Sequence, residues 1–257
     1  MFSSGELALV LIAMIWGTTF SLIQLALKDS GPIFIVGVRF LVAAILFGLV
    51  FVKSFGKIKR TDLVAGVSIG LAYCLTCVLQ AYGLKSVPSS TSAFISAMYV
   101  PMVPLMQRLI TGRAPSWVIW VSTSIAFVGI ALLTAPSPST GRIGTGELLT
   151  LGSAAAMALM IVLISHYSKT SSARLATGIQ LITISFFSFL SMPLVGEFIP
   201  PPLTTNLLLI TGGMGFFSVL ISLTMNWAQQ RPAKISWSRA NPSYRLAWPL
   251  LASKTTT

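Results

Sequence analysis

The sequence predicts an all-α fold, a polytopic bundle of helices that cross a membrane. Only 9% of its 257 residues are charged and 54% are hydrophobic, whereas about a quarter of the residues in a soluble domain are charged. Several stretches also reach, without an acidic residue inside, the roughly 20 apolar residues that a helix needs to cross a hydrocarbon core about 30 Å thick. One such bundle uses the whole chain and leaves no sizeable soluble domain.

Eight spans follow one another along the chain. The first starts near the N-terminus, which lacks the basic segment and the cleavage site of a signal peptide, so we expect it to be retained. The predicted spans are 7–27, 32–52, 64–83, 89–110, 115–134, 147–167, 175–195 and 204–228. The connections between them are KDSG, KSFGKIKRTD, LKSVP, TGRA, APSPSTGRIGTG, SKTSSAR and GEFIPPPLT. These connections are short and rich in turn-forming residues, which predicts up-and-down packing of antiparallel neighbours.

The basic residues predict the orientation of the bundle. The formal charge is +12, but the Lys and Arg residues are scattered, without the contiguous basic face that a nucleic-acid partner requires. With a cytoplasmic N-terminus, the inside connections carry Lys53, Lys57, Lys59, Arg60, Arg108, Arg113, Lys169, Arg174 and Arg231, and the outside connections carry Lys28, Lys85 and Arg142. The positive-inside rule therefore predicts a multi-pass protein of the cell membrane whose N-terminus is cytoplasmic.

The two halves of the chain predict an internal repeat. The Pro- and Gly-rich connection 135–146 divides the spans, and the tripeptide GEL occurs both at 5–7 and at 146–148. The segment LQAYGLKSVPSSTSAFISAMYVP, between the third and fourth spans, has a weak echo in NWAQQRPAKISWSRANP, after the eighth. Two copies of five spans would lie inverted relative to each other, as in many secondary transporters. We expect a five-span repeat over 5–134 and an incomplete, three-span repeat over 146–231, with chance similarity between apolar segments as the alternative.

The residues that catalysis, metal binding or ATP hydrolysis would need are missing from the spans. His166 is the only histidine, and the five acids lie at span ends or in connections: Glu6, Asp29, Asp62, Glu147 and Glu197. General acid-base pairs are therefore absent, and GTGELLTLG lacks the Lys-Ser/Thr of a phosphate-binding loop. Cys74 and Cys77 lie in an apolar span without a second pair of ligands, so we interpret them as small buried residues. The sequence predicts no enzyme, no cofactor and no metal.

Polar and aromatic residues inside the spans are the candidates for binding a small-molecule substrate. Arg39 is the most informative, because a cation within a span costs about 2.5–3.5 kcal/mol and usually faces a cavity or a partner. It lies about 10 Å from the start of its span, a long way for its side chain to reach the headgroups. The candidates are Trp16, Thr18, Arg39, Gln80, Tyr99 and Asn226. Helix packing is the alternative for each of them, and snorkelling to the headgroups is a further alternative for Arg39.

Several motifs resemble those of the EamA family of the drug/metabolite transporter superfamily. They are IWGTTF in the first span, Arg39-Phe40 in the second, AYGLKSVPSSTSAFISAMYVPMVPL through the fourth, GIALLT, GELLTLGSAAAMAL and NWAQQR. The resemblance runs from the N-terminus to about residue 231. It implies ten spans in two inverted halves and a secondary carrier that moves a small metabolite or drug by alternating access. A non-transporting membrane scaffold or partner subunit is the competing prediction, and homo-oligomerisation is left open.

The tail 232–257 departs from this pattern. The resemblance implies a ninth span here that begins near Glu-Pro, but Arg231, Lys234, Arg239 and Arg245 lie across the region, each costing several kcal/mol at the bilayer centre. We expect a frameshifted remnant of the ninth span, because a frame one nucleotide earlier can encode Glu-Pro-Val beneath residues 240–243. On this expectation the chain is an incomplete transporter, which loss of the last two spans could leave inactive. The alternative is a genuine C-terminus on the membrane surface, where Trp237, Tyr244 and Trp248 would suit the interface.

Overall fold

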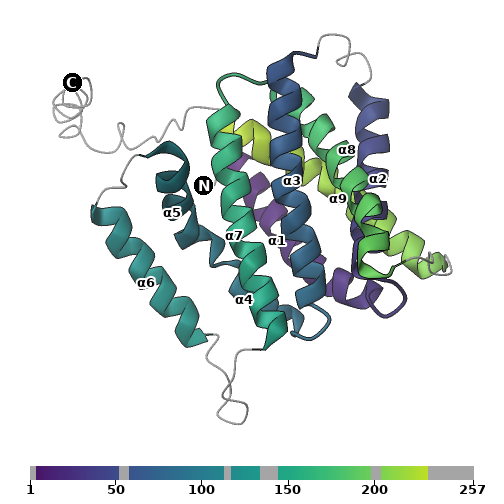
Figure 1. Cartoon of the computed structure of the whole chain (residues 1–257), viewed down its shortest axis with the longest axis horizontal. Coiled ribbons are helices and arrows are strands. Elements are labelled where there is room, and N and C mark those ends of the chain that lie inside the picture. Colours follow the sequence, from purple (N-terminus) through teal and green to yellow (C-terminus); the bar gives the residue numbers. More distant parts are fainter. Residues whose placement is uncertain (1–3, 52–57, 113–116, 134–143, 198–203, 231–257) are drawn as a thin grey trace.

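The computed structural model consists of helices and the turns that join them in the residues that it describes, which are 4–51, 58–112, 117–133, 144–197 and 204–230 (Figure 1). Positions 4–13 and 224–230, and some positions within 111–133, are described by their backbone alone. In the described part of the chain, six stretches are long and apolar enough to cross a membrane. The predicted fold class, an all-α polytopic membrane bundle, is confirmed.

Each predicted span corresponds to a helix or to a pair of consecutive helices. The helices are α1 (Ser4–Ala26), α2 (Pro32–Phe51), α3 (Arg60–Gly83), α4 (Ser89–Ser96), α5 (Tyr99–Thr111), α6 (Trp117–Leu133), α7 (Thr145–Tyr167), α8 (Ala173–Ser191), the 3-10 helix η2 (Met192–Val195) and α9 (Thr205–Gln230). The tail 232–257, with its predicted remnant of a ninth span, lies outside the described residues.

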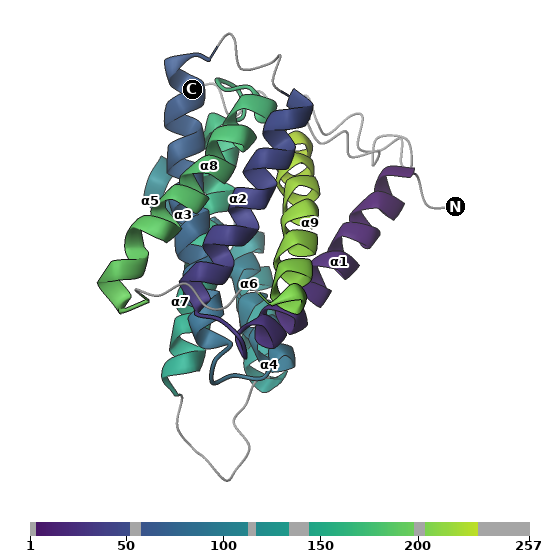
Figure 2. The same cartoon turned by 90° about the vertical axis from the view of Figure 1, so that its right-hand side faces the viewer.

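Helix α3 lies at the centre of the bundle. It packs along α7 and α8, while α2 packs along α8 and α9 and α1 lies against α9 and α4. Figure 2 shows α9 between α2 and α1, and Figure 1 shows α6 at the edge, where it contacts α5 and α4. The large buried side chains of Phe40, Ile69, Leu181 and Met214 fill the space between these helices. The core therefore joins α1–α3 to α7–α9.

Two glycines allow α3 to approach α8 closely. Gly66 and Gly70 are one helical turn apart and face Ile179 and Thr183 of α8. A Cβ atom built on Gly70 would lie 2.7 Å from the Cβ of Thr183, closer than two such carbons approach in real structures. Small residues at this spacing are typical of helix pairs in membranes, where close backbone packing replaces the hydrophobic effect as the source of association.

The outer surface of the helices is apolar, as a lipid-facing surface should be. Leu49, Leu109, Trp117 and Phe186 are among the exposed large apolar side chains. Since lipid tails are as apolar as leucine, such exposure carries no penalty within a bilayer.

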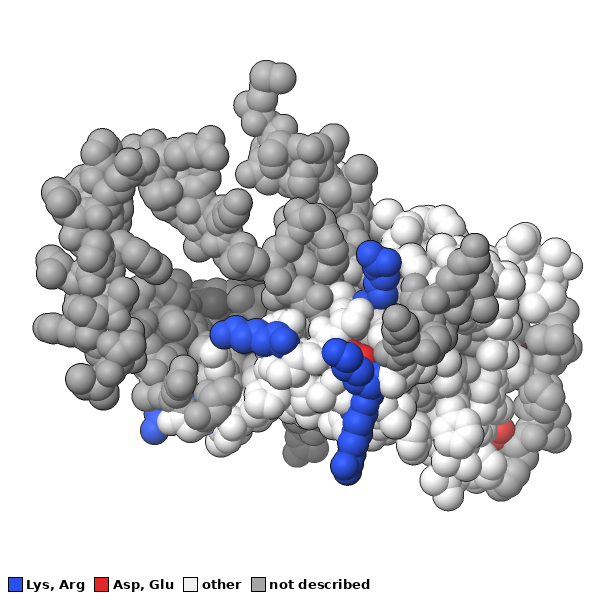
Figure 3. All heavy atoms as spheres, turned by 90° about the horizontal axis from the view of Figure 1, so that it is seen from above, with Lys and Arg blue, Asp and Glu red and all other residues white. Residues whose placement is uncertain are grey.

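The described charged residues gather at the ends of the bundle. We call the end at which α3 begins the Asp62 end and the opposite one the Glu197 end, after a carboxylate at each. Figure 3 views the Asp62 end and shows blue basic side chains around a red acidic one. The basic residues are assigned to an end by the helix terminus in or next to which they lie. The Asp62 end carries Lys59, Arg60, Arg108, Lys169 and Arg174, and the Glu197 end carries Lys28 and Lys85.

The fourth predicted span is not one continuous helix, in contrast to the prediction of a single run over 89–110. Helix α4 ends at Ser96 and α5 begins at Tyr99. Pro101 explains the interruption, because proline has no N–H to donate to the carbonyl of Ala97 and its ring clashes with that carbonyl. The Ala97 carbonyl instead accepts from the N–H of Val100 at 3.1 Å, which tightens the turn.

The seventh predicted span also changes before its predicted end at 195. Helix α8 stops at Ser191, and Met192–Val195 continue as the 3-10 helix η2, whose early position is occupied by Pro193. Gly196 then adopts the left-handed conformation with φ of 80°, which glycine tolerates without strain. This turn sets the position of Glu197, which closes one end of the bundle.

Candidate functional site

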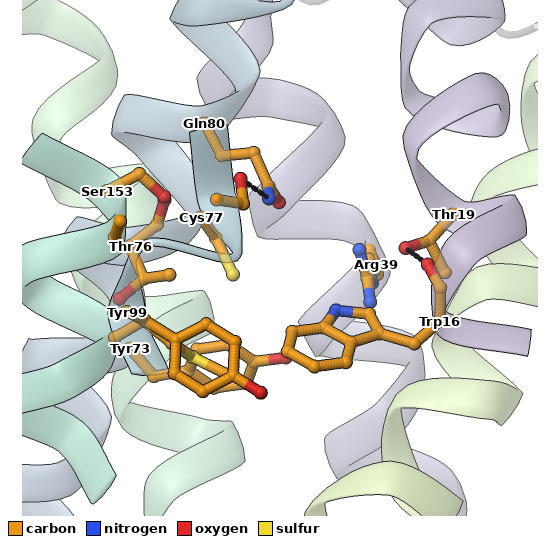
Figure 4. Close-up of a pocket in the computed structure, with 12 residues that line it drawn as sticks. Trp16, Thr19, Arg39, Tyr73, Thr76, Cys77, Gln80, Tyr99 and Ser153 are labelled. Atoms are coloured by element: carbon orange, nitrogen blue, oxygen red, sulfur yellow. Dashed lines mark hydrogen bonds between the residues drawn. The ribbon is translucent and has the colours of Figure 1, made fainter. Parts of the chain in front are cut away.

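A polar cavity lies within the bundle, surrounded by apolar helices (Figure 4). Its volume is about 20 Å³, room for about one water molecule. Helices α1, α2, α3, α4, α5 and α7 contribute to its wall. The lining residues are Trp16, Thr19, Arg39, Tyr73, Thr76, Cys77, Gln80, Ser96, Tyr99, Ser153, Ala154 and Met157. Polar groups at this depth of a membrane protein cost free energy, so a lining of this kind indicates a functional site.

Arg39 supplies the charge of the cavity. Its side chain is only 4% exposed, and its Nε donates a hydrogen bond of 2.6 Å to the Ser218 hydroxyl of α9. The Ser218 hydroxyl in turn donates to the Met214 carbonyl at 2.7 Å. The guanidinium carbon also lies 5.2 Å from the centroid of the Phe40 ring. These contacts hold the guanidinium in place beside the cavity.

Aromatic rings form one side of the cavity. The Trp16 ring of α1 and the Tyr99 ring of α5 lie with their centroids 5.9 Å apart and their planes tilted by 46°. Figure 4 shows both rings and Tyr73 on the same side of the cavity, with Arg39 next to Trp16. Tyr99 reaches this position because the helix is interrupted just before it. The rings offer flat apolar surface and, on their faces, a weak attraction for cations.

Hydroxyl and amide groups also line the cavity. The Gln80 amide donates to the Ser96 hydroxyl over 3.4 Å, which joins α3 to α4. The hydroxyls of Thr19 and Thr76 donate to carbonyls of their own helices, at Trp16 and Ala72, over 2.6 Å and 2.9 Å. A hydroxyl that donates in this way keeps its oxygen lone pairs as acceptors. The wall can therefore accept hydrogen bonds from a solute.

A carboxylate joins helices that are distant in the sequence at each end of the bundle. At one end, Asp62 is 2% exposed and accepts hydrogen bonds from the N–H groups of Lys59, at 3.0 Å, and Ser172, at 2.7 Å. It thus caps both α3 and α8, and we call this arrangement the Asp62 cap. The carboxylate charge also suits the positive ends of the two helix dipoles.

The opposite end carries a similar arrangement, which we call the Glu197 cap. Glu197 accepts hydrogen bonds from the N–H groups of Ile33, at 3.4 Å, and Phe34, at 3.2 Å, at the start of α2. It also accepts one from the Tyr82 hydroxyl at 3.2 Å, at the end of α3. Gly31 has to be a glycine for this approach, because a Cβ there would overlap the Glu197 carboxylate.

Comparison with known proteins identifies the family. The model of the EamA-like transporter family matches residues 3–135, which is more than half of the chain. The chain belongs to this family. The membrane bundle described above is thus that of an EamA-like transporter family member.

The EamA-like chain has curated relatives that are named as transporters. It is 32% identical over 173 residues to an uncharacterized transporter of Archaeoglobus fulgidus, and 26% identical over 187 residues to the uncharacterized transporter YvbV of Bacillus subtilis. These matches cover 65% and 72% of this chain, but only 51% and 61% of the relatives. The chain therefore spans between half and two thirds of the length of these two proteins.

Two further matches are a relative whose name states its substrate and a solved structure with a similar fold. The chain is 33% identical over 96 residues to an S-adenosylmethionine/S-adenosylhomocysteine transporter of Chlamydia trachomatis, covering 35% of this chain and 29% of that protein. A solved crystal structure has a TM-score of 0.55 at 15% identity, covering 84% of this chain and 78% of the other. At that identity the structural likeness concerns the fold alone.

The structure brings four of the six predicted site residues of this EamA-like chain together around the cavity: Trp16, Arg39, Gln80 and Tyr99. Thr18 lies elsewhere, since its side chain is exposed and its hydroxyl donates to the Ile15 carbonyl at 2.7 Å. The neighbouring Thr19 lines the cavity instead, because adjacent helical residues point about 100° apart. Asn226 belongs to α9, in the part described by its backbone alone.

Several lining residues escaped prediction from the sequence. Tyr73, Thr76 and Cys77 lie on the same face of α3 as Gln80, seven, four and three residues before it. This helical periodicity, counted back from Gln80, would have indicated them. Ser153 and Ser218 come from distant helices, and no local pattern marks them apart from other helical serines.

Proposed function

We propose that this EamA-like protein is a secondary transporter that moves a small metabolite by alternating access, with the solute held in the central cavity. The observation that carries the proposal is the position of that cavity, where Arg39, Gln80 and other polar groups converge inside an apolar bundle. Polar residues in such a position are expensive in a membrane protein and mark solute pathways. With room for about one water molecule, the cavity has to widen before a metabolite can enter.

An inverted repeat is part of the proposal. Exchanging α1, α2 and α3 for α7, α8 and α9 leaves the principal packing unchanged: α3 lies on α7 and α8, α9 lies on α1 and α2, and α2 lies on α8. The two caps follow the same exchange. Asp62 opens α3 and caps α8, whereas Glu197 precedes α9 and caps α2. This correspondence supports two inverted repeats, over 5–134 and 146–231, that rock about a central site.

The caps define the two access routes. Opening the cavity toward one end requires the helices at that end to separate, and each cap holds helices of both halves together there. We propose that the Asp62 cap breaks in one open state and the Glu197 cap in the other. The present arrangement, with both caps formed around a small cavity, corresponds to an occluded state of this cycle.

Coupling by a carboxylate proton relay within the spans is not part of the proposal. None of the cavity-lining residues is an acid, and the described acids with bonding partners, Asp62 and Glu197, are engaged at the ends of the bundle. We propose uniport or exchange. The basic residues at the Asp62 end support a cytoplasmic location for that end in the cell membrane.

Reconstitution tests the transport function. The purified chain in proteoliposomes preloaded with unlabelled solute is expected to show saturable uptake of at least one labelled compound. The panel contains S-adenosylmethionine and S-adenosylhomocysteine, because a relative is named for them, together with amino acids, sugars, nucleobases and cationic drugs. Empty liposomes provide the control.

The alternative function, a scaffold or partner subunit, predicts the opposite results. A scaffold would move no solute and would co-purify with another protein in fixed stoichiometry. The mass of the purified complex by light scattering also shows whether the chain forms a homo-oligomer. Absence of uptake together with a stoichiometric partner would overturn the transport proposal.

A further inference from the structure

We infer that the Asp62 end of the bundle binds the headgroup of an anionic phospholipid, which bridges Arg60 at the start of α3 and Arg174 at the start of α8 and thereby stabilises the Asp62 cap. The inference goes beyond the proposed function, because it concerns the surface of the bundle at the membrane boundary. It holds whether or not the chain moves a solute.

The Asp62 cap brings basic residues of two distant segments together. Its carboxylate accepts hydrogen bonds from the N–H groups of Lys59, at 3.0 Å, and Ser172, at 2.7 Å. Arg60 directly follows Lys59, and Arg174 lies two residues after Ser172. Both arginines are therefore in the first turn of their helices, close to the same carboxylate. Figure 3 shows basic side chains around an acidic one at this end of the bundle.

The turn between α7 and α8 adds a further cation to this group. The Tyr167 carbonyl accepts hydrogen bonds from the N–H groups of Thr170 and Ser171, each at 3.0 Å, which fixes the turn that carries Lys169. All four basic side chains of the group are exposed. We call them the basic cluster: Lys59, Arg60, Lys169 and Arg174.

The positive charge at this end exceeds the negative charge. Five basic residues lie there, and Asp62 is the one acid at this end whose side chain the structure describes. Asp62 is also 2% exposed and already accepts two backbone hydrogen bonds. An external anion would therefore lower the repulsion among the exposed cations.

The positions of the two arginines are unfavourable for the helices themselves. The start of a helix carries the positive end of its dipole, which favours anions there and disfavours cations. Arg60 is the first residue of α3 and Arg174 the second residue of α8. A residue that conflicts with local stability in this way indicates a function. A phosphate group suits the position, because it accepts paired hydrogen bonds from a guanidinium.

The surface below Arg60 favours a lipid over a soluble phosphate. Leu63 and Val64 lie one helical turn further along α3 and are 50% and 43% exposed, and Leu71 and Leu75 continue the same exposed face. This apolar stripe of α3 can hold an acyl chain while the headgroup binds the basic cluster. Basic sites at helix ends next to a lipid-facing surface are typical of anionic lipid binding.

A bound headgroup would act in parallel with Asp62. Because Arg60 belongs to α3 and Arg174 to α8, one phosphate that contacts both adds a second link between the helices that Asp62 joins. Anionic lipid is therefore expected to make separation of α3 and α8 at this end less frequent.

Lipid binding to the purified chain tests the site. Native mass spectrometry of the chain in a neutral detergent measures the affinity for phosphatidylglycerol, for phosphatidylcholine and for glycerol phosphate, which is the soluble phosphate probe. Phosphatidylglycerol is expected to bind at least fivefold more tightly than phosphatidylcholine. Glycerol phosphate is expected to bind at least fivefold more weakly than phosphatidylglycerol, because it lacks the acyl chains.

Variants assign the binding to the basic cluster. The double variant Arg60→Gln/Arg174→Gln is expected to lower the affinity for phosphatidylglycerol at least fivefold, and Arg60→Lys/Arg174→Lys is expected to retain part of it. The control is Arg108→Gln/Lys85→Gln, which removes two exposed charges outside the cluster. The Arg108 guanidinium lies over the Trp120 ring of α6 at 6.0 Å, and Lys85 is at the Glu197 end. Size-exclusion profiles identify folded variants, and the single variant Arg174→Gln replaces the double variant if the latter does not fold.

Hydrogen exchange tests the effect on the Asp62 cap. The Ser172 N–H donates to Asp62, so the exchange of a peptide that contains Ser172 reports the opening of the cap. In nanodiscs of phosphatidylglycerol, this exchange is expected to be at least threefold slower than in nanodiscs of phosphatidylcholine. The difference is expected to disappear in Arg60→Gln/Arg174→Gln.

Four results would overturn the inference. Equal affinity for the two lipids would mean that the basic residues serve orientation alone, and equal affinity for glycerol phosphate would mean a site for a soluble phosphate. An equal loss in the control variant would assign the binding to the overall charge. Unchanged Ser172 exchange would remove the link to the cap. A chain that binds phosphatidylglycerol but moves no solute would contradict the proposed function and leave this inference standing.

Discussion

At the scale of single residues, the cavity combines one charge with two rings. Arg39 is fixed by Ser218 on one side and by the neighbouring Phe40 ring on the other. Trp16 and Tyr99 come from helices far apart in the sequence and meet only because α1 packs against α4, directly before α5. A solute in this cavity would therefore lie against residues of α1 and α5 at once.

The first prediction concerns these rings. Trp16→Ala and Tyr99→Ala are each expected to raise the KM for exchange about tenfold, or about 1.4 kcal/mol, because each removes one face of the aromatic wall. Thr18→Ala is the control, since Thr18 is exposed and its hydroxyl bonds only within its own helix. The measurement is the concentration dependence of exchange in proteoliposomes. Equal KM values for all three variants would show that the solute does not touch the rings.

Residue types could be predicted from the sequence better than their partners. Arg39 was predictable because a charge within a span is costly wherever it lies, and Trp16 and Tyr99 because aromatic residues there are conspicuous. That Thr19 and not Thr18 lines the cavity was not predictable, since the helical phase of α1 is set by its contacts with α4 and α9. Ser218 was not predictable either, because its hydroxyl meets Arg39 across 179 positions of sequence.

At the scale of helices, the α3–α8 contact depends on small residues. The second prediction is that Gly70→Ala costs about 1–3 kcal/mol of unfolding free energy, because the new methyl group would overlap Thr183 and approach the Gln180 carbonyl. Gly48→Ala is the matched control, since a Cβ there meets nothing within 4 Å, and alanine is expected to be neutral or stabilising by up to about 1 kcal/mol. Unfolding in mixed micelles, titrated with SDS, measures both variants.

The comparison between these two glycines decides the interpretation. If Gly48→Ala destabilises the protein as much as Gly70→Ala, the loss reflects the substitution of any helical glycine and not close packing. If Gly70→Ala costs less than the expected range and no more than Gly48→Ala, α3 and α8 move apart easily to accommodate the methyl group.

Helix existence was predictable, but helix continuity was not. Hydropathy alone marks each span, because a long apolar run has to be buried in lipid or protein. The interruption between Ser96 and Tyr99 depends on which N–H bonds to the Ala97 carbonyl, since Pro101 has none to donate. Here the donor is Val100, one residue before Pro101. Pro104 sits inside α5 without ending it, so proline in a span indicates a bend or a break but does not select between them.

At the scale of the whole molecule, the two caps join helices that are distant in the sequence at opposite ends of the bundle. The Asp62 cap joins residues 110 positions apart, and the Glu197 cap joins residues more than 160 positions apart. Neither pairing follows from local sequence, since an acid at a span end is also explained by solvent exposure. Only the folded arrangement of α2, α3 and α8 indicates that these carboxylates connect distant helices.

The third prediction is that each cap controls access from its own end. In a Cys74→Ala background, Cys77 is a native probe of the cavity wall. Asp62→Asn is expected to raise the rate of Cys77 modification by an impermeant thiol reagent about tenfold from the Asp62 end. Glu197→Gln is expected to do so from the Glu197 end, because loss of a charged hydrogen-bond acceptor costs about 1.5–3 kcal/mol.

The control for the caps is Asp29→Asn, which removes an exposed carboxylate at the Glu197 end. It is expected to leave the rate unchanged from both sides. An increase from both ends in either cap variant would indicate general loosening of the bundle and would contradict separate access routes.

The fourth prediction is that the Asp62 end faces the cytoplasm. Five described basic residues lie at that end and two at the Glu197 end, and the positive-inside rule places the richer end in the cytoplasm. A cysteine replaces Lys59 or Lys85, which are both exposed and lie at opposite ends. In intact cells, an impermeant maleimide is expected to label Lys85→Cys, while Lys59→Cys is expected to react only after permeabilisation.

Native Cys74 and Cys77 are buried, so the chain with both retained gives the background signal in intact and permeabilised cells. Labelling of Lys59→Cys in intact cells, with Lys85→Cys protected, would invert the orientation. In that case the Glu197 cap would guard the cytoplasmic route, and the excess of basic residues at the Asp62 end would need another cause. Because the two caps are exchanged by the proposed inverted repeat, such a reversal would change which one faces the cytoplasm without changing the mechanism.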